Sequence, residues 1–172
     1  MNILITGGSG FVGGYVFRYF KEKGYSVKNF DISGDEGDPD FIKGSILDFK
    51  AVKHTIFEND ISVIFHFAGF SNINKVKTSP RECINLNILG TTNILEASRL
   101  KGKTSVMLAS SVYVHSQHGH LYTTSKAAAE RILNNYSSLY NINSNIIRLG
   151  TVYGELSRHE DVISIFSQKI CN

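Results

Sequence analysis

Short apolar runs alternate along the chain with longer segments in which apolar residues recur every three or four positions. The short runs are rich in Val, Ile and Phe, which is typical of strands buried on both faces of a parallel sheet. This pattern predicts about six strands, at Asn2–Thr6, Ser26–Asp31, Phe41–Lys43, Ser62–Phe67, Thr104–Ser110 and Asn145–Leu149.

The longer segments have the periodicity of amphipathic helices. Gly24 stands where a glycine commonly ends a helix, and Asp48 stands where an N-cap is needed. The alternation predicts an α/β fold, a doubly wound parallel sheet with helices on both faces, which binds ligands at the carboxyl ends of its strands. The expected helices are Phe11–Lys23, Asp48–Asn59, Pro80–Leu100, Tyr122–Tyr140 and Asp161–Ile170.

The chain has 172 residues, 42% of them hydrophobic, so we expect residues 1–172 to form one domain around one core. Its net charge of +3 comes from scattered residues, which argues against a nucleic-acid partner. No apolar stretch approaches the roughly 20 residues of a membrane helix, and no secretory leader is recognisable. Cys83 and Cys171 lie outside any metal-binding spacing, so we expect no metal site, no disulfide framework and a cytoplasmic location.

Residues Thr6 to Gly13, TGGSGFVG, lie between the first predicted strand and the first predicted helix. Glycines there permit a tight turn and let backbone amides approach a pyrophosphate, although a merely structural turn is the alternative. Asp31 ends the next strand, where a carboxylate can accept the ribose hydroxyls of an adenosine and repel a 2′-phosphate. The sequence therefore favours NAD over NADP, unless Asp31 only begins the polar loop that follows.

Tyr122 and Lys126 lie four residues apart, on one face of a predicted helix. A nearby cation stabilises a phenolate, which suits a tyrosine to act as a base. Ser111 follows the strand just upstream, where its hydroxyl can bind a substrate oxygen. Each feature has a structural alternative, a solvated helix face or a strand-end cap, but together they predict an acid/base site.

Five motifs in this order resemble the extended short-chain dehydrogenase/reductases, the NAD-dependent nucleotide-sugar epimerases and dehydratases. The glycine-rich segment Thr6–Gly13 is similar to TGxxGFxG, and His66–Gly69 is similar to H-[FL]-A-[AG]. Asn87–Ala97 resembles NxxGTxNxLEA, Tyr122–Lys126 resembles YxxxK, and Arg148–Gly154 resembles R-x-x-N-VYG. The resemblance covers essentially the whole chain and implies a Rossmann fold.

The resemblance also implies roles for single residues. Ser111 would orient the reacting oxygen, Tyr122 would be the acid/base, and Lys126 would bind the nicotinamide ribose and tune Tyr122. Asn87 would brace the strand ends, and His66 is expected to pack rather than react. The residues implied in NAD binding are Gly7, Gly10, Phe11, Val12, Gly13, Asp31, Ile32, Ser45, Ile46, Phe67, Ala68, Gly69, Asn87, Tyr122 and Lys126.

The sequence departs from the family pattern at several points. Ser45 stands where an Asp often binds the adenine amino group, and Thr151 stands where an Asn often helps to hold the substrate diphosphate. His115 and Ser116 replace the Tyr and Gly of the SSxxVYG element. We expect the substrate-binding domain of the family to be absent from this chain, apart from a first helix near residues 161–170.

Three functions agree with this interpretation of the sequence. The leading one is a nucleotide-sugar epimerase or dehydratase that transiently oxidises a sugar hydroxyl with NAD. A simpler NAD-dependent reductase is the second, because Tyr122 follows Ser111 by only 11 positions. The third is an inert NAD-binding or dimerisation module. We also expect a homodimer through helices 80–100 and 122–140, which carry apolar residues on more than one face and which the family commonly pairs.

Overall fold

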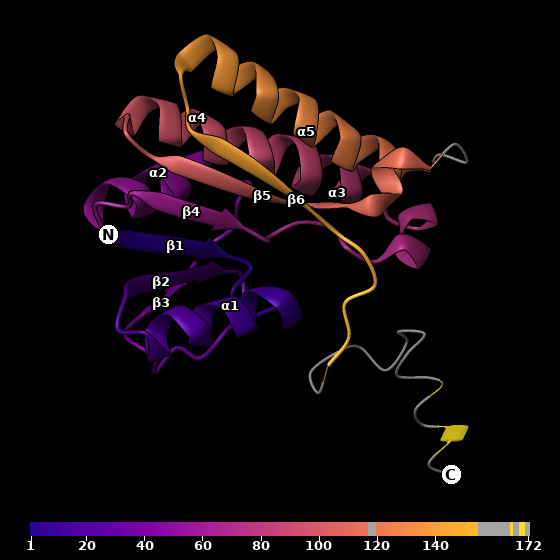
Figure 1. Cartoon of the computed structure of the whole chain (residues 1–172), viewed down its shortest axis with the longest axis horizontal. Coiled ribbons are helices and arrows are strands. Elements are labelled where there is room, and N and C mark those ends of the chain that lie inside the picture. The colour runs from indigo at the N-terminus through magenta and orange to yellow at the C-terminus, as the bar shows by residue number, and fades with distance from the viewer. Residues whose placement is uncertain (117–119, 155–165, 167–168, 171–172) are drawn as a thin grey trace.

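The computed structural model describes residues 1–116, 120–154, 166 and 169–170, and its centre is a parallel six-stranded sheet (Figure 1). The strand order is β3-β2-β1-β4-β5-β6, so the chain winds outward from β1 in both directions. This confirms the doubly wound sheet predicted from the apolar pattern. The strands are β1 Asn2–Thr6, β2 Ser26–Asp31, β3 Phe41–Lys43, β4 Val63–His66, β5 Ser105–Ser111 and β6 Ser144–Leu149.

Helices cover both faces of the sheet, as the alternating pattern predicts (Figure 1). One face is covered by α1, where Phe20 packs against Phe65 of β4, and the other by α2, α4 and α5. The core beneath the second group includes Ile64, which is fully buried. The helices are α1 Phe11–Glu22, α2 Phe49–Glu58, α3 Pro80–Ile84, α4 Thr91–Lys101 and α5 Leu121–Tyr140.

Both predicted helix caps are confirmed. The Asp48 carboxylate accepts a hydrogen bond from the Ala51 amide at 3.1 Å and so caps α2. Gly24 has a φ of +76°, the left-handed conformation that a glycine adopts just beyond a helix. Because these caps and the strand patterns are local, most element ends differ from the prediction by only one residue.

The helix predicted over Pro80–Leu100 is present, but it is not an α-helix throughout. The segment begins as α3, continues as the π-helix η2 Asn85–Gly90, and becomes regular again in α4. A π-turn widens the helix by one residue and rotates the positions within it. The rotated Asn87 side chain contacts both Phe70 and Ser125, and these partners, distant in sequence, account for the irregularity.

The sequence patterns also did not predict two short 3₁₀ turns, η1 Ile73–Lys77 after β4 and η3 Val112–His115 after β5. Both follow carboxyl ends of strands and help to form the rim of the ligand-binding edge. The helix expected at Asp161–Ile170 lies almost entirely outside the described residues. Over residues 1–116 and 120–154, no helix combines the length and the apolar character that crossing a membrane would require.

The sheet topology fixes where a ligand can bind. From β1 the chain passes to β2 on one side, and β4 later pairs with the other side of β1. Because the connections to these two neighbours leave in opposite directions, a crevice opens between them at the carboxyl ends of the strands. Thr6 of β1 pairs in register with His66 of β4. At the far edge, the Arg148 guanidinium of β6 makes two hydrogen bonds, 2.9 and 2.7 Å, to the buried Glu130 carboxylate of α5.

Candidate active site

A cleft of about 770 Å³ lies at the carboxyl ends of the strands. Fifteen of the sixteen residues predicted for cofactor binding or catalysis line it, and Asn87 lies behind its wall. The cleft thus joins the glycine-rich segment, the end of β2 and the start of α5 in one continuous space. The predicted residues that line it are Gly7, Gly10, Phe11, Val12, Gly13, Asp31, Ile32, Ser45, Ile46, Phe67, Ala68, Gly69, Ser111, Tyr122 and Lys126.

The glycine-rich segment is shaped by contacts that leave no room for side chains. Gly7 has a φ of +76°, and a Cβ there would lie 2.6 Å from the Ala68 nitrogen. A Cβ on Gly13 would clash with the Gly7 carbonyl oxygen. The first amides of α1 have no partner within the helix, and they open toward the cleft. This cradle fits a pyrophosphate, whose charge the helix N-terminus favours.

Asp31 is held in position by two backbone amides. Its Oδ2 accepts a hydrogen bond from Ser9 at 3.1 Å, and its Oδ1 accepts one from Ile32 at 2.7 Å. A carboxylate has about four acceptor positions, so two remain for ribose hydroxyls. The glycine-rich segment and Asp31 are therefore joined directly, and a ribose bound to Asp31 would adjoin the pyrophosphate cradle.

Beyond Asp31 the cleft ends against Ile32 and the segment after β3. The Ser45 hydroxyl accepts a hydrogen bond from the Leu47 amide at 3.2 Å, which leaves its proton available to a ligand. The Ile46 carbonyl accepts one from the buried Asn93 side chain at 2.8 Å. A base attached to the ribose at Asp31 would reach these residues, as the resemblance implies for adenine.

The opposite end of the cleft is lined by Ser111, Tyr122 and Lys126. The Ser111 hydroxyl accepts a hydrogen bond from Tyr113 N at 3.2 Å and caps η3, so its proton can still be donated to a substrate oxygen. Tyr122 and Lys126 are one turn apart on α5, and both are buried. The structure therefore brings the three predicted catalytic side chains to one wall.

Lys126 is a buried cation. Its ammonium donates a hydrogen bond to the Ala109 carbonyl at 3.0 Å, and its side chain is 8% exposed. Burial lowers the pKa of Lys126 from 10.5 to about 8, because a charged amine is poorly solvated there, and Cys83 opposes this shift. The ammonium is thus still charged near neutral pH, in the place where a cation can stabilise a neighbouring phenolate.

Asn87 supports the cleft from behind. Its Oδ1 accepts a hydrogen bond from the Phe70 amide at 2.8 Å, and its Nδ2 donates to the Phe70 carbonyl at 3.2 Å. The same Nδ2 donates to Ser125 Oγ on α5 at 2.9 Å. A Cβ on Gly69 would lie 2.7 Å from Asn87 Oδ1, so the chain passes closely over this side chain. Asn87 therefore ties the segment after β4 to the helix of Tyr122 and Lys126.

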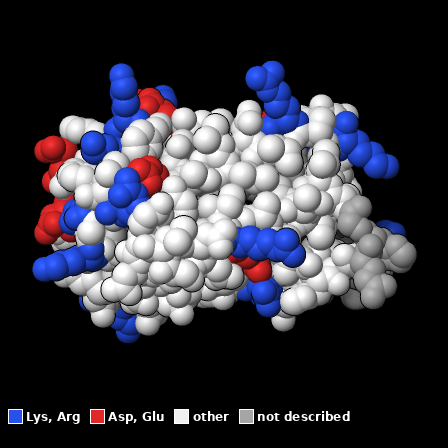
Figure 2. All heavy atoms as spheres, turned by 90° about the horizontal axis from the view of Figure 1, so that it is seen from above, with Lys and Arg blue, Asp and Glu red and all other residues white. Residues whose placement is uncertain are grey.

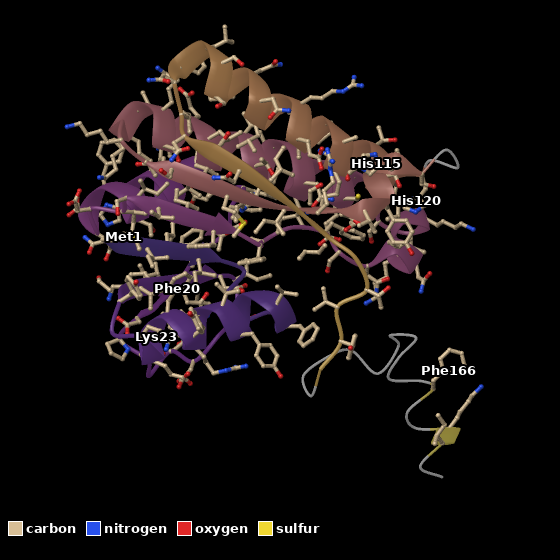
Figure 3. The ribbon with its side chains drawn as sticks, viewed as in Figure 1. Met1, Phe20, Lys23, His115, His120 and Phe166 are labelled. Atoms are coloured by element: carbon tan, nitrogen blue, oxygen red, sulfur yellow. The ribbon has the colours of Figure 1, made fainter. Side chains whose placement is uncertain are left out.

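Sequence reasoning missed several residues of the cleft. Ser71 and Asn72, which precede η1 and belong to no recognised motif, line its open end, and so does Tyr113 of η3, at a variable position of the SSxxVYG element. His120, labelled in Figure 3, was missed as well. It is outside the cleft lining, but it caps α5 through its Nδ1, and its ring lies 6.0 Å from that of Tyr122. Its position just before a helix was the only signal that could have found it.

A sequence profile of the NAD dependent epimerase/dehydratase family matches residues 3–172. The chain belongs to this family. A UDP-glucuronate 4-epimerase of Thermodesulfobacterium geofontis is 30% identical over 95% of this chain and 59% of its own length. The chain spans about half to three fifths of the length of the curated relatives that it matches.

Solved structures of family members have the same fold. The UDP-glucose 4-epimerase of Thermus thermophilus, crystallised with NAD, has a TM-score of 0.85 at 25% identity, covering 98% of this chain and 61% of that chain. The UDP-glucose 4-epimerase of Thermotoga maritima, crystallised with UDP-glucose, has a TM-score of 0.88 at 25% identity, covering 98% of this chain and 62% of that chain. The fold described above is thus that of the NAD dependent epimerase/dehydratase family.

The lowered pKa of Lys126 predicts a pH-dependent stability. Between pH 8 and 10.5 the unfolded chain holds this proton while the folded chain has lost it, so the free energy of unfolding rises with pH in that window. Across this window, the free energy of unfolding of wild type should rise by ~3 kcal/mol relative to that of Lys126→Met, as measured by denaturant unfolding at several pH values. Lys50→Met, at an exposed position, is the control. Parallel curves for wild type and Lys126→Met would contradict the shift.

Proposed function

We propose that the chain binds NAD and supplies the acid/base half of a nucleotide-sugar epimerase or dehydratase. The observation that carries this proposal is the single cleft that joins the glycine cradle and Asp31 to Ser111, Tyr122 and Lys126. Membership of the NAD dependent epimerase/dehydratase family supports it independently. When bound, NAD would supply a nicotinamide that takes a hydride from a sugar carbon and returns it.

The remaining chemistry belongs to side chains of this chain. The Tyr122 phenolate takes the proton of the sugar hydroxyl as that carbon is oxidised. The resulting phenol returns the proton as the carbon is reduced. The Ser111 hydroxyl donates a hydrogen bond to the same oxygen and orients it. The Lys126 ammonium stabilises the phenolate and hydrogen-bonds the nicotinamide ribose. Asn87 keeps the segment after β4 and the helix α5 in register, so that the donors stay aligned.

The substrate class in this proposal is a nucleotide sugar. Its support is the named activity of the relatives, which act on UDP-glucose or UDP-glucuronate according to their names. The open end of the cleft offers uncharged hydroxyl and amide groups from Ser71, Asn72 and Thr151, which suit sugar hydroxyls. A short-chain reductase is the second candidate, favoured by the short link from Ser111 to Tyr122.

We expect a preference for NAD over NADP, because Asp31 offers a carboxylate where NADP carries a phosphate. Asp31→Ala should weaken NAD binding by about 1–3 kcal/mol, the range for hydrogen bonds to a charged group. Asp35→Ala, in the exposed loop that follows, is the matched control and should leave the affinity unchanged. Calorimetric titration with both cofactors measures this, and equal or tighter binding of NADP would refute it.

We also propose a homodimer through α5 and the α3–α4 segment. Figure 2 shows this layer of helices from above, with few charged side chains over its middle. The sequence supports the same view, because no charged residue occurs from Cys83 to Leu95 and Arg131 is the one exposed charge of α5. Leu89, in the π-helix, is 49% exposed and would be covered by a second copy.

Leu89→Arg should therefore shift the protein toward monomer by placing a charge in an apolar contact. Tyr19→Arg is the matched control, an exposed position on α1 across the sheet, and should leave the assembly unchanged. Light scattering at tens of micromolar compares the two. A wild-type monomer at that concentration, or an equal effect of both substitutions, would count against the interface.

The 172-residue polypeptide should turn over UDP-, GDP- and dTDP-sugars slowly, because the family members that it matches are longer and correct positioning supplies several kcal/mol of a barrier. Tyr122→Phe should remove most of whatever activity is measured. Tyr140→Phe, on the same helix but at its far end, should have no effect. Activity that survives Tyr122→Phe would defeat the assignment of the acid/base, and rapid turnover would show that these residues alone position the sugar.

A further inference from the structure

The His66 imidazole lies in the interior between two threonine hydroxyls. Its Nδ1 is 2.7 Å from Thr6 Oγ1, at the end of β1, and its Nε2 is 3.1 Å from Thr91 Oγ1, at the start of α4. His66 is 1% exposed, and both threonines are buried. The ring therefore spans the distance between the strand that leads into the glycine cradle and the helix that follows Asn87.

The other bonds of the two threonines decide which imidazole nitrogen carries the proton. The Thr91 hydroxyl donates to the Asn87 carbonyl at 2.7 Å, so it can only accept from His66, and Nε2 must be protonated. A neutral ring then has an unprotonated Nδ1, which accepts from the Thr6 hydroxyl. Thr6 Oγ1 in turn accepts from the Ala68 amide at 3.3 Å. Each hydroxyl donates once and accepts once, so all the donors and acceptors in this set are matched.

A second set of hydrogen bonds leads from the Asn87 side chain into α5. Asn87 Nδ2 donates to Ser125 Oγ at 2.9 Å, and the Ser125 hydroxyl donates to the Tyr122 carbonyl at 2.8 Å. Asn87 also fixes the Phe70 amide and carbonyl. The first set of hydrogen bonds, from the Ala68 amide beside the glycine cradle, ends at the Asn87 main-chain carbonyl, and the second set, which reaches the Tyr122 carbonyl, begins at the Asn87 side-chain amide. The covalent frame of Asn87 joins the two sets.

We propose that His66 is a positioning residue, held as the neutral Nε2-protonated tautomer, that connects the glycine cradle to the helix of Tyr122 and Lys126 through these two sets of hydrogen bonds, which meet at Asn87. A protonated ring would donate from both nitrogens and would leave the Thr6 hydroxyl proton without its acceptor. The link to NAD binding rests on the proposed function; the tautomer and the hydrogen bonds do not.

The surroundings of His66 favour the neutral ring. Burial, together with the nearby Lys126 ammonium, lowers the pKa of His66 from 6.5 to about 3. An unmatched polar group at this depth costs more than a hydrogen bond contributes, so a single wrong proton would destabilise the whole set. The neutral tautomer therefore persists throughout the range in which an exposed histidine titrates.

The first test is long-range ¹H–¹⁵N NMR of the wild-type histidines, with His66→Asn to assign the signal and His54→Asn, at an exposed position, as the matched control. We expect the Nε2-protonated pattern for His66, unchanged between about pH 5 and 8 and unaffected by His54→Asn. An Nδ1-protonated ring, or protonation of His66 within that range, would overturn the proposal. This result does not depend on any ligand.

The second test separates the two halves of the ring. In His66→Asn the amide oxygen can replace Nδ1 toward Thr6, whereas in His66→Gln the amide nitrogen can replace Nε2 toward Thr91. We expect His66→Gln to raise the Kd for NAD about tenfold, and His66→Asn to change it by less than about threefold. Amide exchange at Phe70 should show the opposite order, faster in His66→Asn and near wild type in His66→Gln.

Equal effects of both substitutions on both readouts would mean that His66 only fills space, and would refute the proposal. If wild type fails to bind NAD, the proposed function fails, while the NMR pattern and the exchange at Phe70 still decide the role of His66. If His66→Asn fails to fold, His66→Gln assigns the His66 signal, and the wild-type NMR pattern then decides the tautomer.

Discussion

The carboxyl ends of β1 and β4 can touch only because Gly7 has no side chain. A Cβ there would lie 2.6 Å from the backbone of Ala68, and the φ of +76° is itself one that glycine adopts readily. This contact sets the direction in which the chain leaves β1, and with it the start of α1 over the sheet. Gly13 then approaches the Gly7 carbonyl, so the first amides of α1 face the crevice at which the winding of the sheet reverses. The cradle, Asp31 beside it and the wall of α5 opposite all follow from this approach of two backbones.

Polar groups buried beneath the cleft make the arrangement rigid, because each of them needs a partner at that depth. Asn87 and His66 provide those partners, and together they join β1, the segment after β4, the π-helix and α5. The π-helix is explained by the same requirement, since it turns Asn87 toward Phe70 and Ser125.

Lys126 differs from these neutral groups because it is charged. Its ammonium is buried and donates a hydrogen bond to the Ala109 carbonyl. Burying this charge lowers the stability of the fold near neutral pH, and it leaves a cation next to the proposed acid/base.

Local patterns predicted the greater part of the fold. All six strands were predicted within a residue or so, and Asp48 and Gly24 cap their helices, because apolar alternation and capping depend on neighbours in sequence. The glycine-rich segment and the spacing of Tyr122 and Lys126 likewise brought fifteen predicted residues to one cleft. The π-helix could not be predicted, since its cause is a contact between Asn87 and residues 17 and 38 positions away. Asn72 and Tyr113 were missed for a similar reason. The topology of the sheet brings η1 and η3 to the rim of the cleft, and neither residue occupies a fixed position of a motif.

We infer that one cleft holds both the cofactor and the acid/base residues. Backbone NMR of the 172-residue chain during a titration with NAD tests it most directly, because each amide reports on its own surroundings. We predict saturable shifts at Gly7, Asp31 and Gly69 and at Lys126, with none at the smaller hollow between Arg99 and Asn143 at the opposite edge of the sheet. Shifts confined to that second hollow, or shifts at Gly7 and Asp31 that never reach Lys126, would contradict the claim.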